Sequence, residues 1–351
     1  MNLMQQHINN LDGFRGFAAL LVVVSHYSNL TGVLGGVLGE GGGQAGVMLF
    51  FMLTGFLIAR LHLGQEFTKS NLLEYAFKRV ARVYPLFIII AALPSFLSWS
   101  GFPGKIAMSD IASFSAYLGQ ITLIDRGYGV LWTIQIEFIF YIAFVAIWFA
   151  ASKAGSAVIA ASLLAITCLL VAGGLSYGYD FFNRCHYFVF GVVIAIFANS
   201  KPVSNSTRLK SVVGVLLLIS VPVMFPKFSK IFLGLEVDSW RSYIVMVQFL
   251  FLFIIAVSDR YYLSAILSCR PLRWVGKVSY SLYLIHYFVL LPFLEWVPPV
   301  SSYAVNFVFF LSLTLLVSWL SYRFLERPLQ KIFLVPIRSE IASGKVLESS
   351  R

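Results

Sequence analysis

The chain has 351 residues, of which 59% are hydrophobic and only 12% are charged. Soluble domains carry about 25% charged residues, so this composition excludes a soluble enzyme, a disordered chain and a disulfide scaffold, and it indicates a membrane protein with several spans. The net charge of +11 would suggest nucleic-acid binding in a soluble domain. Here most basic residues lie in short segments between apolar runs, so we assign them to membrane topology and expect no nucleic-acid partner.

A helix needs about 20 predominantly apolar residues to cross the hydrocarbon core of a bilayer, and ten segments meet that requirement. They are Leu11–Leu30, Ala45–Leu63, Val83–Ser100, Leu131–Ala150, Ser156–Gly173, Phe182–Ala198, Leu209–Phe225, Trp240–Ser258, Val278–Val297 and Tyr303–Phe324. A further apolar segment, Ile106–Ile124, is diluted by polar residues, and we expect it to form an interfacial or re-entrant helix. The predicted fold class is an all-α polytopic membrane protein with about ten transmembrane helices.

Basic residues concentrate in the cytoplasmic segments of multi-span membrane proteins. With the N-terminus inside, the ten predicted spans place 20 of the 26 Lys and Arg residues on the cytoplasmic side and 6 on the outer side. We therefore expect both termini in the cytoplasm. The chain divides into a transmembrane domain, residues 1–328, and a short basic cytoplasmic tail, residues 329–351. The stretch Gly35–Gly43 lacks the Lys-Ser/Thr of a phosphate loop, and we expect a flexible outer loop.

Four ionisable side chains lie within predicted spans: Arg15, His26, Glu137 and His286. Each costs about 2.5–3.5 kcal/mol on the insertion scale and therefore needs an explanation. Arg15 and His26 are eleven residues apart, close to three helical turns, so they share a face, with Arg15 near the inner end and His26 in the outer half.

On the predicted topology, Glu137 can lie at the depth of His26. A histidine beside a carboxylate is the arrangement that a general base needs, because the carboxylate orients the imidazole and stabilises its charged form. A structural hydrogen-bonded pair, or two groups that never meet, are the alternatives.

Other polar residues in or beside the spans have simpler explanations. His286 is mid-span, and a hydrogen bond to a neighbouring hydroxyl or carbonyl is the favoured interpretation. Asp180 and Arg184 are expected at the membrane interface, where they could line a polar acceptor site. Glu326 follows Arg323 by three residues, so an ion pair on the helix surface explains it.

Two arginines, Arg79 and Arg82, lie three residues apart in the predicted loop between the second and third spans. They share a face if this segment is helical. Anchoring of the topology is the simpler interpretation. The alternative is an anion clamp, because a guanidinium binds phosphate through two parallel hydrogen bonds. Phosphates bound on the cytoplasmic side would indicate a nucleotide-type donor.

Six motifs, in chain order, resemble the integral-membrane acyltransferase family three. The first is an Arg–His motif: Arg15 and His26 match R-x10-H, and the segment around Arg15 resembles LDGLRGIAA. Another is an Arg–Arg motif, in which Arg79 and Arg82 match R-x-x-R. The other four segments are Gly46–Ile58, similar to GVDLFFVLSGFLI; Leu131–Phe138, similar to LWSLSVEEQF; Ser279–His286, similar to SYSLYLWH; and Tyr322–Pro328, similar to YRFIERP. Met48 and Phe138 stand where the family usually has acidic residues.

The resemblance runs from Leu11 to Pro328 and implies a bacterial carbohydrate O-acyltransferase of the stand-alone type, multi-pass in the inner (plasma) membrane. It implies transfer of an acyl group, usually acetyl, from cytoplasmic acyl-CoA to a hydroxyl of a carbohydrate. O-antigen, exopolysaccharide and lipid-linked sugars are the acceptors it suggests. Acetyl-CoA would be the donor substrate, membrane lipids would surround the protein, and no metal is expected.

The resemblance and the positions of the polar residues together suggest a functional role for each of these residues. Arg15, Arg79 and Arg82 are expected to bind the phosphates of CoA. His26 takes the proton of the acceptor hydroxyl, or carries the acyl group itself, and Glu137 orients His26. A transporter or flippase for a lipid-linked or amphipathic substrate, or a non-catalytic scaffold, would also explain charges inside the membrane, but the six motifs favour the enzyme.

Overall fold

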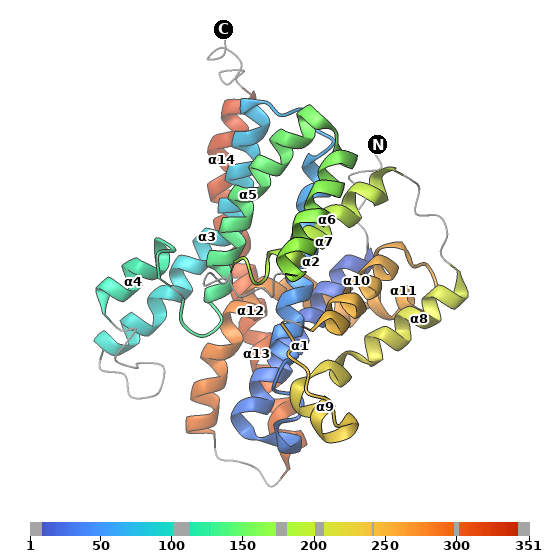
Figure 1. Cartoon of the computed structure of the whole chain (residues 1–351). Helices are drawn as coiled ribbons and strands as arrows, with labels where there is room; N and C mark the ends of the chain where they lie inside the picture. Colours follow the sequence, from blue (N-terminus) through green and yellow to red (C-terminus); the bar gives the residue numbers. More distant parts are fainter. Residues whose placement is uncertain are drawn as a thin grey trace. The chain divides into compact units, whose positions relative to one another are not determined.

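The computed structural model describes residues 9–100, 113–125, 127–172, 181–200, 207–240, 242–297 and 302–342, and these ranges contain helices and no strand (Figure 1). The all-α prediction is confirmed. The helices, in order, are α1 (Asn9–Thr31), η2 (Val33–Gly36), α2 (Gly42–His62), α3 (Lys69–Trp99), α4 (Phe114–Ile121), α5 (Trp132–Ala154), α6 (Ser156–Ala172), α7 (Cys185–Ser200), α8 (Arg208–Ile219), η4 (Val221–Met224), α9 (Pro226–Leu233), α10 (Tyr243–Ser258), α11 (Tyr262–Leu267), α12 (Arg270–Trp296), α13 (Tyr303–Ser321), η5 (Tyr322–Glu326) and α14 (Arg327–Ala342).

Several helices are long and apolar enough to cross a membrane. Five candidates are Gly42–His62, Lys69–Leu97, Trp132–Ala154, Arg270–Trp296 and Tyr303–Leu334, and three shorter apolar helices are Ser156–Leu169, Cys185–Ala198 and Tyr243–Ser258. A multi-pass membrane protein follows from these helices. The count of ten spans and the side on which each terminus lies stay predictions. Most of the segment Ile106–Ile124 lies outside the described residues, and its end forms the short helix α4.

Two predicted elements differ from the structure. The predicted seventh span, Leu209–Phe225, is α-helical only as far as Ile219, because Pro222 follows and the chain turns through η4 into α9. The stretch Gly35–Gly43, expected to be a flexible loop, includes the end of η2 and the start of α2. It is tied to α1 by a hydrogen bond from the hydroxyl of Ser25 to the carbonyl oxygen of Gly39.

The helix that contains the third predicted span begins earlier than the span itself. Hydropathy places it at Val83, whereas α3 begins at Lys69 and runs through 31 residues. The segment before Val83 is rich in Leu, Ala, Glu, Lys and Arg, which are strong helix formers, and it contains neither Gly nor Pro. Arg79 and Arg82 therefore lie inside a helix, and the expectation that they share a helical face is confirmed.

The chain forms two compact units, each assembled from two segments. Unit 1 comprises Met1–Gln65 and Ala146–Ser279, and unit 2 comprises Glu66–Val145 and Tyr280–Arg351. Each unit therefore depends on pairing between parts of the chain that are distant in sequence.

Unit 1 is built on close packing of α1, α2 and α7. A Cβ atom at Gly55 of α2 would lie 2.1 Å from the carbonyl oxygen of Phe188, and one at Gly191 of α7 would lie 2.1 Å from the carbonyl oxygen of Met52. Only glycine lets the two backbones approach this closely, as in other membrane helix pairs. The ring of Phe51 stacks on that of Phe188 at 4.3 Å between centroids.

Polar residues in unit 1 join α1, α8, α10 and α11. The amide of Asn10 donates to the carbonyl oxygens of Ala256 at 3.0 Å and Asp259 at 2.9 Å. The carboxylate of Asp259 accepts from the Ser211 hydroxyl at 3.0 Å and from the backbone N–H of Ser264 at 2.8 Å. This buried network is satisfied internally, so we regard it as structural.

Candidate functional site

Unit 2 places the two predicted arginines beside the predicted acid. Arg79 and Arg82 are half-buried on α3, and Arg79 interacts electrostatically with Glu137 of α5 and with the phenols of Tyr75 and Tyr141. Tyr75 donates a hydrogen bond to the carbonyl oxygen of Tyr141 at 2.9 Å, and the Tyr141 hydroxyl donates to the Glu137 carboxylate. We call these five residues the arginine cluster.

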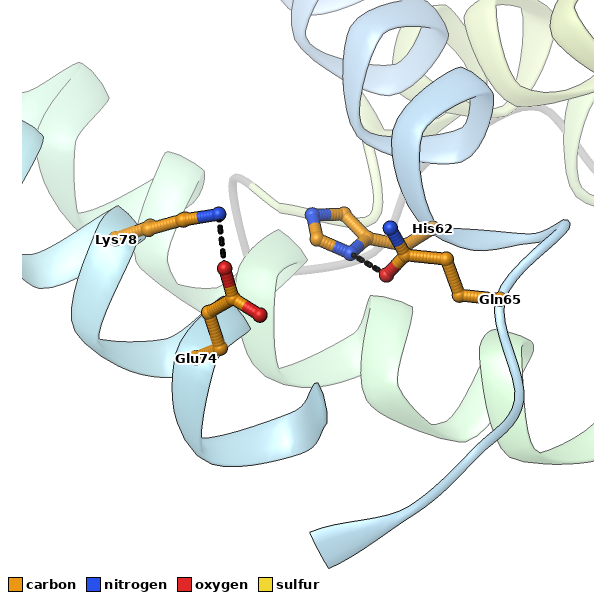
Figure 2. Close-up of polar contacts among 4 residues, drawn as sticks. All are labelled: His62, Gln65, Glu74 and Lys78. Atoms are coloured by element: carbon orange, nitrogen blue, oxygen red, sulfur yellow. Dashed lines mark hydrogen bonds and ion pairs between the residues drawn. The ribbon is translucent and has the colours of Figure 1, made fainter. Parts of the chain in front are cut away.

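The Arg79 guanidinium is incompletely satisfied. Its Nε atom is buried and contacts no hydrogen-bond acceptor among the described residues. Neither Arg79 nor Arg82 forms an ion pair with a carboxylate in the part of the chain that the structure describes. By contrast, the neighbouring Lys78 is exposed and pairs with Glu74 on the same helix, as Figure 2 shows. A half-buried cation with an unpaired donor is suited to binding an anionic ligand.

Tyrosines of α12 complete the surroundings of the arginine cluster. The hydroxyl of Tyr280 donates to the carbonyl oxygen of Val83 at 2.6 Å, and Tyr280 interacts electrostatically with Glu137. The Thr133 hydroxyl donates to the Tyr283 hydroxyl at 3.1 Å. Sequence reasoning missed these tyrosines, since tyrosine is common in membrane helices and its partners lie far away in the chain.

Glu326 does not form the predicted surface ion pair with Arg323. It is 6% exposed and accepts hydrogen bonds from the Ser281 hydroxyl at 2.6 Å and the Gln330 amide at 3.3 Å. Arg323 is exposed and lies over aromatic rings of its own helix. The segment is a π-helical turn, η5, in which residues three apart no longer share a face. Glu326 also interacts electrostatically with Arg82.

Unit 1 holds the other two predicted site residues, Arg15 and His26, both on α1 as expected. Arg15 Nη1 lies 3.8 Å from Asp12 Oδ1, a loose ion pair one turn away. His26 is partly exposed and lies beside the start of α2, where a Cβ atom at Gly43 would be 3.8 Å from His26 Nε2.

The predicted pairing of His26 with Glu137 stays a prediction, because the two residues belong to different units. The same holds for the approach of Arg15 to Arg79 and Arg82. Within unit 2, Glu137 already has partners of its own in Tyr141 and Arg79.

The remaining predicted polar residues have the following surroundings. His286 is fully buried and its Nδ1 lies 3.1 Å from the carbonyl oxygen of Leu282, so the expected hydrogen bond to a neighbouring carbonyl is confirmed. The Arg184 guanidinium lies 4.5 Å from the centre of the Trp240 ring. Asp180 lies outside the described residues.

A second buried histidine is explained by local contacts. His62, at the end of α2, has its Nδ1 3.2 Å from Gln65 Oε1, as Figure 2 shows. The indole N–H of Trp148 donates to the carbonyl oxygen of Gln65 at 3.0 Å, which fixes the same turn. In the described ranges, no three His, Cys, Asp or Glu side chains come together as a metal site would require.

Comparison with known proteins identifies the family. Residues 8–323 match the acyltransferase domain family, so this chain belongs to that family and is an acyltransferase by class. The matched range includes all five predicted site residues and confirms the resemblance of the motifs.

Two curated relatives are O-acetyltransferases. The chain is 27% identical over 368 residues to O-acetyltransferase OatA of Staphylococcus aureus, in an alignment that covers 93% of this chain and 58% of the relative. It is 28% identical over 366 residues to peptidoglycan O-acetyltransferase OatA of Listeria monocytogenes, covering 93% of this chain and 56% of the relative. The chain therefore spans less than two thirds of the length of these relatives. No solved structure matches it.

The environment of Glu326 predicts a stability difference between two neighbouring substitutions. Glu326→Ala removes the close acceptor of the buried Ser281 hydroxyl and one acceptor of Gln330, and it should lower stability by about 1–3 kcal/mol. Arg323→Ala, at an exposed position, should have little effect. The thermal stability of each detergent-solubilised variant is measured by heating it and determining the remaining folded fraction by size-exclusion chromatography. Equal, small effects would favour the surface ion pair instead.

Proposed function

We propose that this chain is a membrane O-acetyltransferase that moves an acetyl group from cytoplasmic acetyl-CoA to a hydroxyl of a cell-surface or lipid-linked carbohydrate. Family membership and the names of the relatives, one of which acts on peptidoglycan, support this activity. The observation that carries the proposal is the buried Arg79 guanidinium, whose open Nε donor awaits an anionic partner.

Arg79 and Arg82 bind the phosphates of the donor in this proposal. Basic residues that only anchor a topology lie at exposed helix ends. Arg79 and Arg82 instead lie ten and thirteen residues after the first residue of α3, which is about 15 and 20 Å along the helix axis. A guanidinium presents a planar fork that matches phosphate oxygens. Arg15, from the first motif, is proposed as a third contact to the same donor.

His26 is the proposed general base. It accepts the proton of the acceptor hydroxyl as that oxygen attacks the thioester, and Glu137 is proposed to orient it and to stabilise its charged form. Within unit 2, Glu137 would also help to hold Arg79, with which it interacts electrostatically. These two roles predict different kinetic effects of the same substitution.

The proposed topology has ten spans with both termini in the cytoplasm of a bacterial cell, and the protein lies in the inner membrane. It rests on the excess of basic residues in alternate segments of the sequence. Residues 1–328 form the transmembrane domain in this proposal and residues 329–351 the basic tail, which begins within α14.

His26→Ala tests the base. Transfer of radiolabel from acetyl-CoA to membrane glycan should fall about 10²–10⁴-fold, the usual effect of losing a general base. The amount of protein in the membrane should not change. His62→Gln is the matched control, because the His62 side chain contacts the turn at Gln65 and the ring of Trp148. Full acetylation by His26→Ala would rule out the base role.

Substitution of the arginines tests the donor site. Arg79→Ala and Arg82→Ala should each raise the KM for acetyl-CoA about 10- to 100-fold, because charge-assisted hydrogen bonds contribute about 1.5–3 kcal/mol and act on substrate and transition state alike. Arg82→Lys should recover only part of the affinity. Lys78→Ala, on the exposed face of the same helix, should leave KM unchanged.

An unchanged KM in both alanine variants, together with less protein in the membrane, would identify Arg79 and Arg82 as topology anchors. Rates are therefore compared at matched protein amounts, with acetyl-CoA concentration varied for each variant.

Glu137→Gln separates the two roles of the acid. If Glu137 orients His26, kcat should fall about 10²-fold or more and the KM for acetyl-CoA should change little, because the imidazolium loses its counter-charge only in the transition state. Glu74→Gln, an exposed residue that pairs with Lys78, is the matched control. A raised KM with unchanged kcat would instead assign Glu137 to the arginine cluster alone.

A further inference from the structure

The first turn of α2 presents backbone donors without acceptors. The N–H groups of Gly42, Gly43 and Gln44 precede the first intrahelical bond, which runs from the N–H of Ala45 to the carbonyl oxygen of Gly41 at 2.8 Å. Gly41, the N-cap residue, has φ +84 and offers no side chain to cap the helix. Among the described residues, no backbone carbonyl outside the helix accepts from these three donors.

A buried hydroxyl at the same place also lacks a partner. Ser239 is 3% exposed, and its Oγ atom makes no hydrogen bond to any described residue. A Cβ atom at Gly41 would lie 2.3 Å from this Oγ, so the hydroxyl is directly against the N-cap of α2. Buried hydroxyls are nearly always hydrogen-bonded, and an unpaired one beside three open N–H groups indicates a ligand atom that accepts hydrogen bonds.

His26 lies beside the same helix end. A Cβ atom at Gly43 would lie 3.8 Å from His26 Nε2 and 3.2 Å from Ser25 Oγ. Cβ atoms tilt toward the N-terminus of a helix, so this direction leads toward the open N–H groups. His26, Gly43 and Gln44 are all partly exposed, whereas Gly41 and Gly42 are buried. The partly exposed part of this helix end is therefore the part at Gly43 and Gln44, beside His26.

We propose that the N-terminus of α2, with Ser239, is the site that binds the acetyl carbonyl oxygen during transfer; this inference rests on the proposed function. His26 Nε2 takes the proton of the acceptor hydroxyl, whose oxygen attacks the carbonyl carbon. The carbonyl oxygen becomes an oxyanion and accepts hydrogen bonds from the first turn of α2 and from the Ser239 hydroxyl. The carbon–sulfur bond then breaks, the carbonyl re-forms, and the thiolate leaves with the proton from His26, so the products are an acetyl ester and a free thiol.

The electrostatics of the helix end suit this role. The aligned peptide dipoles place partial positive charge at the N-terminus of α2, where the oxyanion forms. Donors that are fixed before the reaction stabilise the transition state more than the ground state, which increases kcat.

Two substitutions test the site. Gly43→Ala places a methyl group beside His26 Nε2, where the carbonyl would lie, and alanine is a better helix former than glycine. Ser239→Ala removes one donor and also removes an unpaired buried hydroxyl, so the melting temperature should stay constant or rise. The matched control is Ser242→Ala, in the same segment, because the Ser242 side chain does not cap α10.

The experiment uses membranes containing the full chain, radiolabelled acetyl-CoA as donor and the glycan of those membranes as acceptor. Ser239→Ala should lower kcat by about 100-fold, the effect of losing one oxyanion donor. Gly43→Ala keeps its backbone N–H, and it should lower kcat because its methyl group displaces the reacting carbonyl from the donors. The KM for acetyl-CoA should not change in either variant. Ser242→Ala should match the unsubstituted protein.

Full kcat in both variants, or a loss that only follows a lower melting temperature, would overturn the oxyanion site while leaving the proposed function intact. An unsubstituted protein that transfers no acetyl group from acetyl-CoA to glycan would contradict the proposed function, and the oxyanion site would fall with it.

Discussion

The absence of water from the hydrocarbon core of a membrane is the constraint on which the rest of this structure depends. Backbone groups must pair within helices, and each polar side chain among those helices needs a partner. Asp259, His286 and Glu326 meet this requirement through hydrogen bonds within their own units. Arg79 Nε and Ser239 Oγ do not, among the described residues. Other buried atoms, such as His186 Nε2 and Thr314 Oγ1, also lack a partner there, so an unpaired atom indicates a substrate site only where the neighbouring groups suit a ligand.

The open groups differ in chemistry, and each kind suits one part of acyl transfer. Arg79 and Arg82 carry charge and lie among tyrosines in unit 2, an environment suited to phosphate. The first turn of α2 in unit 1 carries neutral N–H donors beside His26, which suits a carbonyl oxygen that becomes charged only during reaction. A donor-binding contribution to KM and a transition-state contribution to kcat are therefore expected from different residues, and the kinetic experiments can distinguish them.

Two sequence-based predictions differ from the structure because a hydropathy scale assigns every charged residue to an exposed position. Arg79 and Arg82 were expected in a loop between two spans, but α3 includes both, and Arg79 interacts there with tyrosines and with the Glu137 carboxylate of α5. The spacing of Arg323 and Glu326 suggested a surface pair on an α-helix. The π-helical turn changes which side chains share a face, and Ser281 supplies the partner of Glu326 from another helix.

The sequence by itself determined the all-α membrane class and the acyltransferase family, because apolar runs and short motifs are local properties of the chain. It also identified Arg15, His26, Arg79, Arg82 and Glu137 as candidate site residues, and it explained His286 by a bond within one helical turn. Only the tertiary structure decided which groups are left without partners. Glu137 meets Arg79 across two helices, and Ser239 meets Gly41 across nearly 200 residues of chain. Such contacts depend on how distant helices pack, which no spacing within a single segment specifies.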